Sequence, residues 1–103
     1  MPVRFEWSPA KAAANRRKHG VSFEVAIRVF YDPFALSQQL GIEGGEQRWQ
    51  TLGVVEGQVL LLVAHTVWEE SDDIAGSLTE VIRIISARAA DRKERHRYEH
   101  ENR

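Results

Sequence analysis

The sequence predicts a single small α+β domain in which helices pack on an antiparallel sheet, in the order β-α-α-β-β-β-α. Short stretches rich in β-branched residues, separated by polar turns, fill much of the second half of the chain and predict strands. Segments with helix start and stop signals stand near both ends. A length of 103 residues suits one core, so we expect one domain over residues 1–103.

The first third of the chain is predicted to form a strand followed by two helices. Apolar and charged residues alternate over residues 3–7, as in a half-buried strand. Ser8 then provides an N-cap, and Gly20 provides the left-handed residue that ends the first helix. Ser22 caps the second helix, whose apolar residues recur at helical spacing until Asp32-Pro33 ends it.

A β-hairpin is predicted in the middle of the chain. The pattern is weak from Phe34 to Gln39, and residues 41–45 are predicted to be an exposed loop. Strands are predicted over residues 47–55 and 59–65, with a tight turn between them. The acidic and polar segment from Glu69 to Leu78 is predicted to be a loop.

The last predicted strand, residues 81–88, carries an arginine inside an apolar, β-branched run. A guanidinium cannot lose its proton to escape burial, so Arg83 must reach a partner, water or an anionic ligand. Asp91 and Glu94 then resemble a capping box and predict the start of a C-terminal helix.

The net charge of −1 conceals a segregation of charge along the chain. Residues 1–40 hold six basic and three acidic side chains, residues 41–80 hold one and eight, and residues 81–103 hold seven and four, giving +3, −7 and +3. If the basic ends meet in space, they form an anion-binding face. The alternative is a set of solvated helix faces.

Composition also excludes several classes of protein. The chain has no cysteine, so it has neither a disulfide framework nor a zinc-thiolate site. No apolar run approaches the ~20 residues of a membrane span, and the N-terminus lacks a signal-peptide core. His96 and His100 are four apart, as in a metal pair, but we expect no metal and no cofactor. The simplest expectation is a cytoplasmic protein.

Several separated stretches resemble one known family. They are Phe5-Glu6-Trp7-Ser8-Pro9-Ala10-Lys11, Lys18-His19-Gly20-Val21-Ser22-Phe23-Glu24, Asp32-Pro33, Ile82-Arg83-Ile84-Ile85-Ser86-Ala87-Arg88 and the later Tyr98. Together they are similar to the BrnT family of type II toxins, over nearly the whole chain. This resemblance implies a RelE-like fold and a ribonuclease that inhibits translation. It also implies a BrnA-like antitoxin, which forms a heteromeric complex through its own dimerisation and binds operator DNA.

Cleavage of RNA without a metal requires cations for the phosphate, a base for the 2′-hydroxyl and an acid for the leaving oxygen. Arg83 and Arg88 are the predicted phosphate ligands, because a guanidinium binds phosphate oxygens bidentately and stays charged. Their spacing of five gives opposite parity, so a regular strand would send them to opposite faces. We expect them to converge only if the chain turns after Ser86.

His19 and His65 are the candidates for moving protons, because histidine titrates near neutral pH. Each has a structural alternative. His65 stands at the end of an apolar strand, where histidines often belong to the core and bond to the backbone. For His19 the alternative is a residue that closes a helix and opposes the negative end of the helix dipole.

Further residues are predicted to bind RNA or the antitoxin. Lys18, Arg48, Ser86 and Tyr98 are candidate RNA contacts, although Arg48 could instead form a cross-strand ion pair and Tyr98 could pack the last helix on the sheet. The predicted antitoxin contacts lie along the last helix: Arg88, Arg92, Arg95 and Tyr98. The competing hypothesis is a non-catalytic RNA- or protein-binding module with the same basic face.

Overall fold

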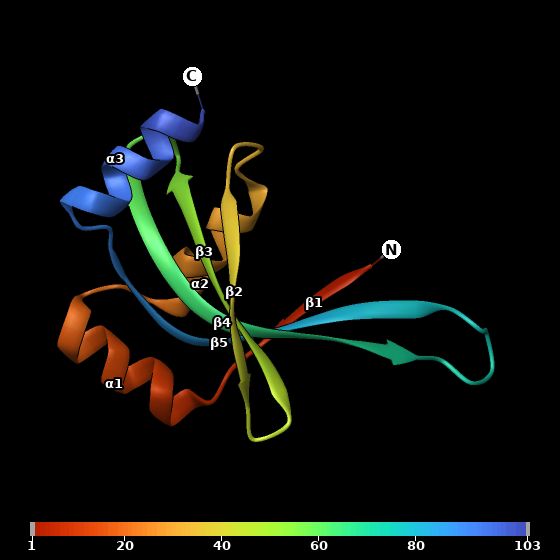
Figure 1. Ribbon diagram of the computed structural model, residues 1–103. Helices are drawn as coiled ribbons and strands as arrows, with labels where there is room; N and C mark the ends of the chain where they lie inside the picture. Colours follow the sequence, from red (N-terminus) through yellow and green to blue (C-terminus); the bar gives the residue numbers. More distant parts are fainter. Residues whose placement is uncertain (1, 103) are drawn as a thin grey trace.

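The computed structural model describes residues 2–102 and contains one five-stranded sheet with helices on both of its faces (Figure 1). No helix in this range is long and apolar enough to cross a membrane. The elements in chain order are β1 (Val3–Glu6), α1 (Pro9–His19), α2 (Phe23–Ala26), the 3-10 helix η1 (Ile27–Tyr31), β2 (Leu36–Glu43), β3 (Glu46–Val55), β4 (Val59–Ser71), β5 (Leu78–Ala89) and α3 (Arg92–Glu101).

The strands lie in the order β1-β5-β4-β3-β2. The α+β class is confirmed, and one detail of the sheet differs from the prediction. Strands β2 to β5 pair antiparallel, whereas β1 pairs parallel with β5, so the sheet is mixed. The parallel pairing follows from α1 and the elements after it, which separate β1 from β5 in the chain and leave β1 at the sheet edge.

One face of the sheet, the core face, is covered by α1, α2 and η1. Leu61 and Val63 of β4 point to it, together with Ile84 of β5. Gly53 of β3 also belongs to this face, because a Cβ there would lie 2.9 Å from the Cβ and from the carbonyl oxygen of Val29. A closely packed η1 therefore requires glycine at position 53. The buried residues of this core are Phe23, Ala26, Val29, Val55, Leu61, Val63, Ile82, Ile84 and Ala87.

Helix α1 is attached to the sheet by a buried amide. Its side chains are mostly polar and exposed, but Asn15 is only 6% exposed. The Asn15 side chain donates to the carbonyl of Ala87 at 2.9 Å and accepts from the Ala87 amide at 3.0 Å. It also donates to the carbonyl of Val21 at 3.0 Å, beyond the helix end. One side chain thus ties β5, α1 and the following turn together.

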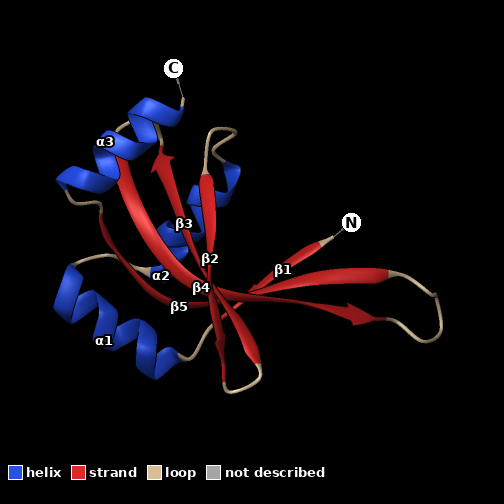
Figure 2. Cartoon of the chain, in the orientation of Figure 1, coloured by secondary structure: helices blue, strands red, loops and turns tan. Residues whose placement is uncertain are grey.

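The opposite face, which we call the open face, carries Leu62, Ala64, Thr66 and Trp68 of β4, the alternate residues of the strand. Helix α3 covers one end of it. Leu52 and Leu62 are buried there with Ala90, and Tyr98 of α3 packs against them. Figure 2 shows α3 apart from α1. Within residues 2–102, no helix covers the rest of the open face.

A β-bulge in β5 decides which side chains reach the open face. Ser86 pairs with Ala64 and Ile84 pairs with His65, so Ile85 has no partner in the register. Because of this additional residue, side chains five positions apart across the bulge point to the same face of the sheet. Arg83 pairs with Thr66 and Arg88 pairs with Leu62, which lie on the same face of β4. The two arginines therefore share the open face without the turn after Ser86 that the sequence interpretation required.

Two predictions for the middle of the chain were wrong. Residues 36–43, interpreted as a weak pattern and a loop, form the edge strand β2. Residues 69–71 and 78, interpreted as loop, lengthen β4 and β5, and only residues 72–77 connect them. Both errors have one cause: β2 and the added ends of β4 and β5 are exposed, so no alternation of apolar residues marks them. The β4–β5 hairpin extends far from the body of the molecule (Figure 2).

Replacing Asn15 by alanine is expected to lower the free energy of unfolding by about 2–4 kcal/mol, because the buried amide and carbonyl of Ala87 both lose their partner. The matched control is Lys11→Ala, an exposed residue one turn earlier in the same helix, which should change the free energy of unfolding by less than about 0.5 kcal/mol. Urea unfolding followed by circular dichroism measures both. Equal effects of the two substitutions would contradict this role for Asn15.

Candidate functional site

A row of polar side chains crosses the middle of the open face. Arg48 of β3 pairs in register with Thr66 of β4, Thr66 pairs with Arg83 of β5, and Arg83 pairs with Glu6 of β1. Side chains in register on one face of a sheet are immediate neighbours. Four strands thus bring two arginines, a threonine and a carboxylate into one line.

The side chains around Arg83 hold it loosely. Its guanidinium lies 3.6 Å from Glu6 and 3.5 Å from Glu46, and both carboxylates are 38% exposed. The guanidinium also stands over the ring of Trp68, 5.0 Å from its centroid. The Arg83 side chain is 44% exposed. Long, solvated ion pairs of this kind contribute little to stability and exchange partners readily.

Thr66 and Arg48 hold unused hydrogen-bonding groups at the centre of the row. Thr66 is 1% exposed, and its hydroxyl has no partner among the described residues. The Nε of Arg48 is also buried without a hydrogen-bond partner in that range, and Glu43 is 3.8 Å away. A buried polar group without a partner costs about 1–3 kcal/mol. The row is therefore suited to binding a polar ligand.

Arg88 shares the open face but is held tightly. Two of its nitrogens donate to the two carboxylate oxygens of Glu94, each at 2.9 Å. Hydrogen bonding to Arg88 is the largest cause that lowers the pKa of Glu94. The same carboxylate accepts from the Asp91 amide and completes the capping box of α3. Arg88 thus anchors the start of α3, and Ser86 lies between the two arginines on the open face.

Tyr98 anchors the other end of α3. Its hydroxyl donates to Asp32 at 2.6 Å, and the Val54 amide donates to the same oxygen at 2.8 Å. Burial raises the pKa of Asp32, but the bonds from Tyr98, Val54 and Phe34 together bring that pKa below its ordinary value of 3.8. Burial and then Asp32 raise the pKa of Tyr98 to about 12. Asp32, which the sequence marks only as a helix end, is therefore a structural hub.

His65 lies on the core face and not beside Arg83. It is 2% exposed, its ring is 4.9 Å from that of Phe30, and its Nε2 is 2.7 Å from the Thr51 hydroxyl. The hydroxyl of Ser37 is in turn 2.8 Å from that of Thr51. Burial lowers the pKa of His65 to about 4, so the imidazole is neutral at pH 7. These contacts give His65 the position of a core residue.

The remaining candidates lie away from the row. Lys18 and His19 are exposed at the end of α1, on the side of the sheet that carries the core face. Arg92 and Arg95 are exposed on α3 and line a shallow groove of about 460 Å³. Within residues 2–102, no group of three or more histidine, aspartate or glutamate side chains is arranged to hold a metal ion.

Sequence reasoning missed three residues that contact Arg83. None of the three, Glu6, Glu46 and Trp68, was predicted to lie at the site. Glu6 alternates with apolar neighbours in its strand, which marks it as a side chain on the outer face of the sheet. Glu46 and Trp68 carry no such signal, because their approach to Arg83 depends on the register of β3, β4 and β5.

Tyr98→Phe is expected to lower the free energy of unfolding by about 1–2 kcal/mol at pH 7, since it removes a hydrogen bond to a charged group. The pKa of Asp32 is lowered on folding, so the stability it contributes is present above pH 3.8 and is lost as the pH falls below that value. The difference between Tyr98→Phe and the unmodified protein should therefore narrow in that acidic range. Urea unfolding at several pH values measures it.

The control for this experiment is Tyr31→Phe. Tyr31 is 70% exposed, so the loss of its hydroxyl should change the free energy of unfolding by less than about 0.5 kcal/mol at every pH. A difference for Tyr98→Phe that stays constant into acid would show that the charge of Asp32 is not involved.

Comparison with known proteins agrees with this architecture. A search of curated proteins finds no match. The crystal structure of the ribonuclease toxin BrnT of Brucella abortus matches with a TM-score of 0.51 and 18% identity, over 89% of this chain and 100% of that one, and it supports the fold. Residues 7–94 match the family model described as the ribonuclease toxin, BrnT, of type II toxin–antitoxin systems. The chain therefore belongs to the BrnT family of ribonuclease toxins.

Proposed function

We propose that this toxin is a metal-independent endoribonuclease whose active site is the row on the open face. The observation that supports this most directly is Arg83, a permanent cation that is half exposed and held by long ion pairs and a tryptophan ring. A phosphate can replace the carboxylates of Glu6 and Glu46 around it, because charge-assisted bonds to phosphate are shorter and bidentate. The fixed guanidinium charge then stabilises the charge that develops on phosphorus.

The proton acceptor in this proposal is a carboxylate. In the reaction the 2′-oxygen attacks the neighbouring phosphorus to form a 2′,3′-cyclic phosphate, the bond to the 5′-oxygen breaks, and water supplies the proton that the 5′-oxygen takes up. Glu6 and Glu46 lie within 3.6 Å of the Arg83 guanidinium, so either can reach a 2′-hydroxyl beside a phosphate bound there. His65 is buried on the other face, and His19 lies at the end of α1.

The cellular role follows from this activity. Cleavage of messenger RNA in the cytoplasm would stop translation, so we propose that the toxin inhibits protein synthesis in this way. Adding the purified toxin to a cell-free translation mixture tests the step directly. The basic residues of α1, Lys18 among them, would then attract RNA without taking part in the chemistry.

A type II system implies an antitoxin, and we propose a BrnA-like protein that covers α3 and the adjoining open face. The exposed side of α3 carries Arg92, Lys93 and Arg95 around a shallow groove. Charge complementarity would favour an acidic surface on the partner and would speed association. Arg88 and Tyr98 would contribute to this interface from the inner side of α3, because they hold the helix in place. In this proposal, the toxin contacts operator DNA only through the antitoxin.

Incubation of the antitoxin-free protein with RNA in the presence of EDTA tests the reaction. Cleavage is expected to persist, because Arg83 supplies the positive charge at the phosphate that a metal would otherwise supply. Gel electrophoresis of the products measures it, with the same RNA and no protein as the control. Loss of cleavage on chelation, with recovery on adding a divalent ion, would reject the metal-independent mechanism.

Arg83→Ala is expected to lower kcat by roughly two orders of magnitude or more, as for other groups that bind the transition state. Arg16→Ala, on α1 and away from the row, should act mainly on binding and on its salt dependence. Circular dichroism controls for folding, since Arg83 lies within β5. Small and equal effects of both changes would favour the non-catalytic binding module.

Hydrogen exchange with and without antitoxin tests the proposed interface. Amides of residues 92–98 are expected to exchange more slowly in the complex, because the partner covers α3 and prevents its opening. The exposed acidic hairpin, residues 69–80, serves as the internal comparison, since it would repel an acidic partner. Protection limited to residues 69–80, with residues 92–98 unchanged, would place the interface elsewhere.

A further inference from the structure

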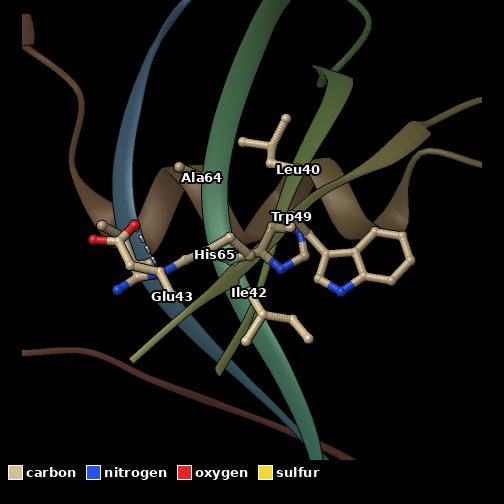
Figure 3. Close-up of a pocket in the computed structure, with 9 residues that line it drawn as sticks. Leu40, Ile42, Glu43, Trp49, Ala64 and His65 are labelled. Atoms are coloured by element: carbon tan, nitrogen blue, oxygen red, sulfur yellow. Dashed lines mark ion pairs between the residues drawn. The ribbon is translucent and has the colours of Figure 1, made fainter. Parts of the chain in front are cut away.

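A cavity of about 290 Å³ lies between β2 and the strands beside it, next to the polar row (Figure 3). Strand β2 has a bulge here, because the register shifts between Gln39 and Gly41 and leaves Leu40 without a partner. Figure 3 shows residues from β2, β3 and β4 around this space. Its lining residues are Leu40, Gly41, Ile42, Glu43, Arg48, Trp49, Ala64, His65 and Ile85.

The cavity has apolar walls that the protein leaves uncovered. Leu40 is 54% exposed and Ile42 is 70% exposed, although both line the cavity. Large apolar side chains on the rim of a cavity are typical of a site for a flat, partly apolar ligand. A nucleobase has such a shape, and it gains free energy by covering apolar side chains.

The polar groups of the cavity specify which base would fit. The Nε of Arg48 is buried with no hydrogen-bond partner among residues 2–102. This nitrogen can only donate, so the ligand must present acceptors. Glu43 lines the same cavity, with its carboxylate 3.8 Å from the Arg48 Nε and 78% exposed. An ionised carboxylate can only accept, so the ligand must also present donors.

Guanine matches the donor Arg48 and the acceptor Glu43 better than the other bases do. It presents two adjacent acceptors, O6 and N7, which arginine binds bidentately in many complexes. It also presents two adjacent donors, N1–H and the N2 amino group, which a carboxylate can accept together. Adenine, cytosine and uracil each lack at least one of these two pairs. Arg48 would therefore donate to O6 and N7, and Glu43 would accept from N1 and N2.

The position of the cavity suits an RNA strand bound at the row. Arg48 and Arg83 are separated by one strand, because both pair with Thr66. Neighbouring strands lie about 4.8 Å apart, so the two backbones are about 10 Å apart. We infer that the cavity is a guanine-specific subsite, which fixes where the toxin engages RNA through Glu43 and Arg48. This inference depends on the proposed function only for the identity of the polymer.

Binding of mononucleotides tests the subsite without any cleavage. GMP, AMP, CMP and UMP carry the same phosphate, so differences in affinity report on the base alone. GMP is expected to bind at least tenfold more tightly than the other three, as for one bidentate pair. In ¹⁵N-labelled protein, GMP should also shift the side-chain Nε–H signal of Arg48, which Arg48→Lys identifies. Equal affinity for the four nucleotides, or no shift of that signal, would overturn the inference.

Glu43→Gln provides the specific variant. The amide keeps the size of the side chain but no longer offers two equivalent acceptors, so the preference for GMP should fall by roughly tenfold. Glu24→Gln on α2 removes an exposed carboxylate far from the cavity and should leave the preference unchanged. An unchanged preference in Glu43→Gln would overturn the role of Glu43.

Cleavage assays separate this inference from the proposed function. Selective GMP binding without RNA cleavage would reject the ribonuclease mechanism and support the subsite. RNA cleavage without selective GMP binding would support the ribonuclease mechanism and overturn the subsite.

Discussion

The bulge at Ile85 is the constraint on which the open face depends. Without this unpaired residue, Arg83 and Arg88 would lie on opposite faces of β5, and one of them would point into the core. The end of the strand beyond the bulge is held by Asn15, whose amide binds both backbone groups of Ala87. A buried amide on α1 therefore contributes to the placement of a cation on the far side of the sheet.

The two arginines of β5 have different roles because their partners differ. Glu94 binds Arg88 bidentately and also caps α3, so moving Arg88 would disturb a helix. Arg83 is held by two longer ion pairs and a tryptophan ring, and none of these closes a structural element. Only Arg83 can change partners at low cost. A substrate phosphate would therefore be bound there, while Arg88 keeps α3 and the edge of the site in position.

Sequence reasoning predicted the helices that have clear caps and the strands whose apolar residues are buried. The caps at Ser8, Ser22 and Asp91 are present, and the buried strands lie where β-branched residues cluster. It failed at β2, an exposed edge strand with no alternation to detect. The site was predicted less well, because register and bulges decide which side chains meet. The carboxylates around Arg83 come from β1 and β3 and could not be assigned without the sheet order.

Charge on the open face is locally balanced, so the residues that attract RNA over a distance differ from the residues that bind its phosphate. Arg48, Arg83 and Arg88 each lie within 4 Å of a carboxylate, so the row itself exerts little long-range attraction on RNA. The unbalanced cations lie instead on the two exposed helices, at the end of α1 and along α3. These helices can draw a polyanion toward the molecule, and exchange of ion pairs at Arg83 then selects a correctly positioned phosphate. An antitoxin that covers α3 would remove part of that attraction even where it left the row uncovered.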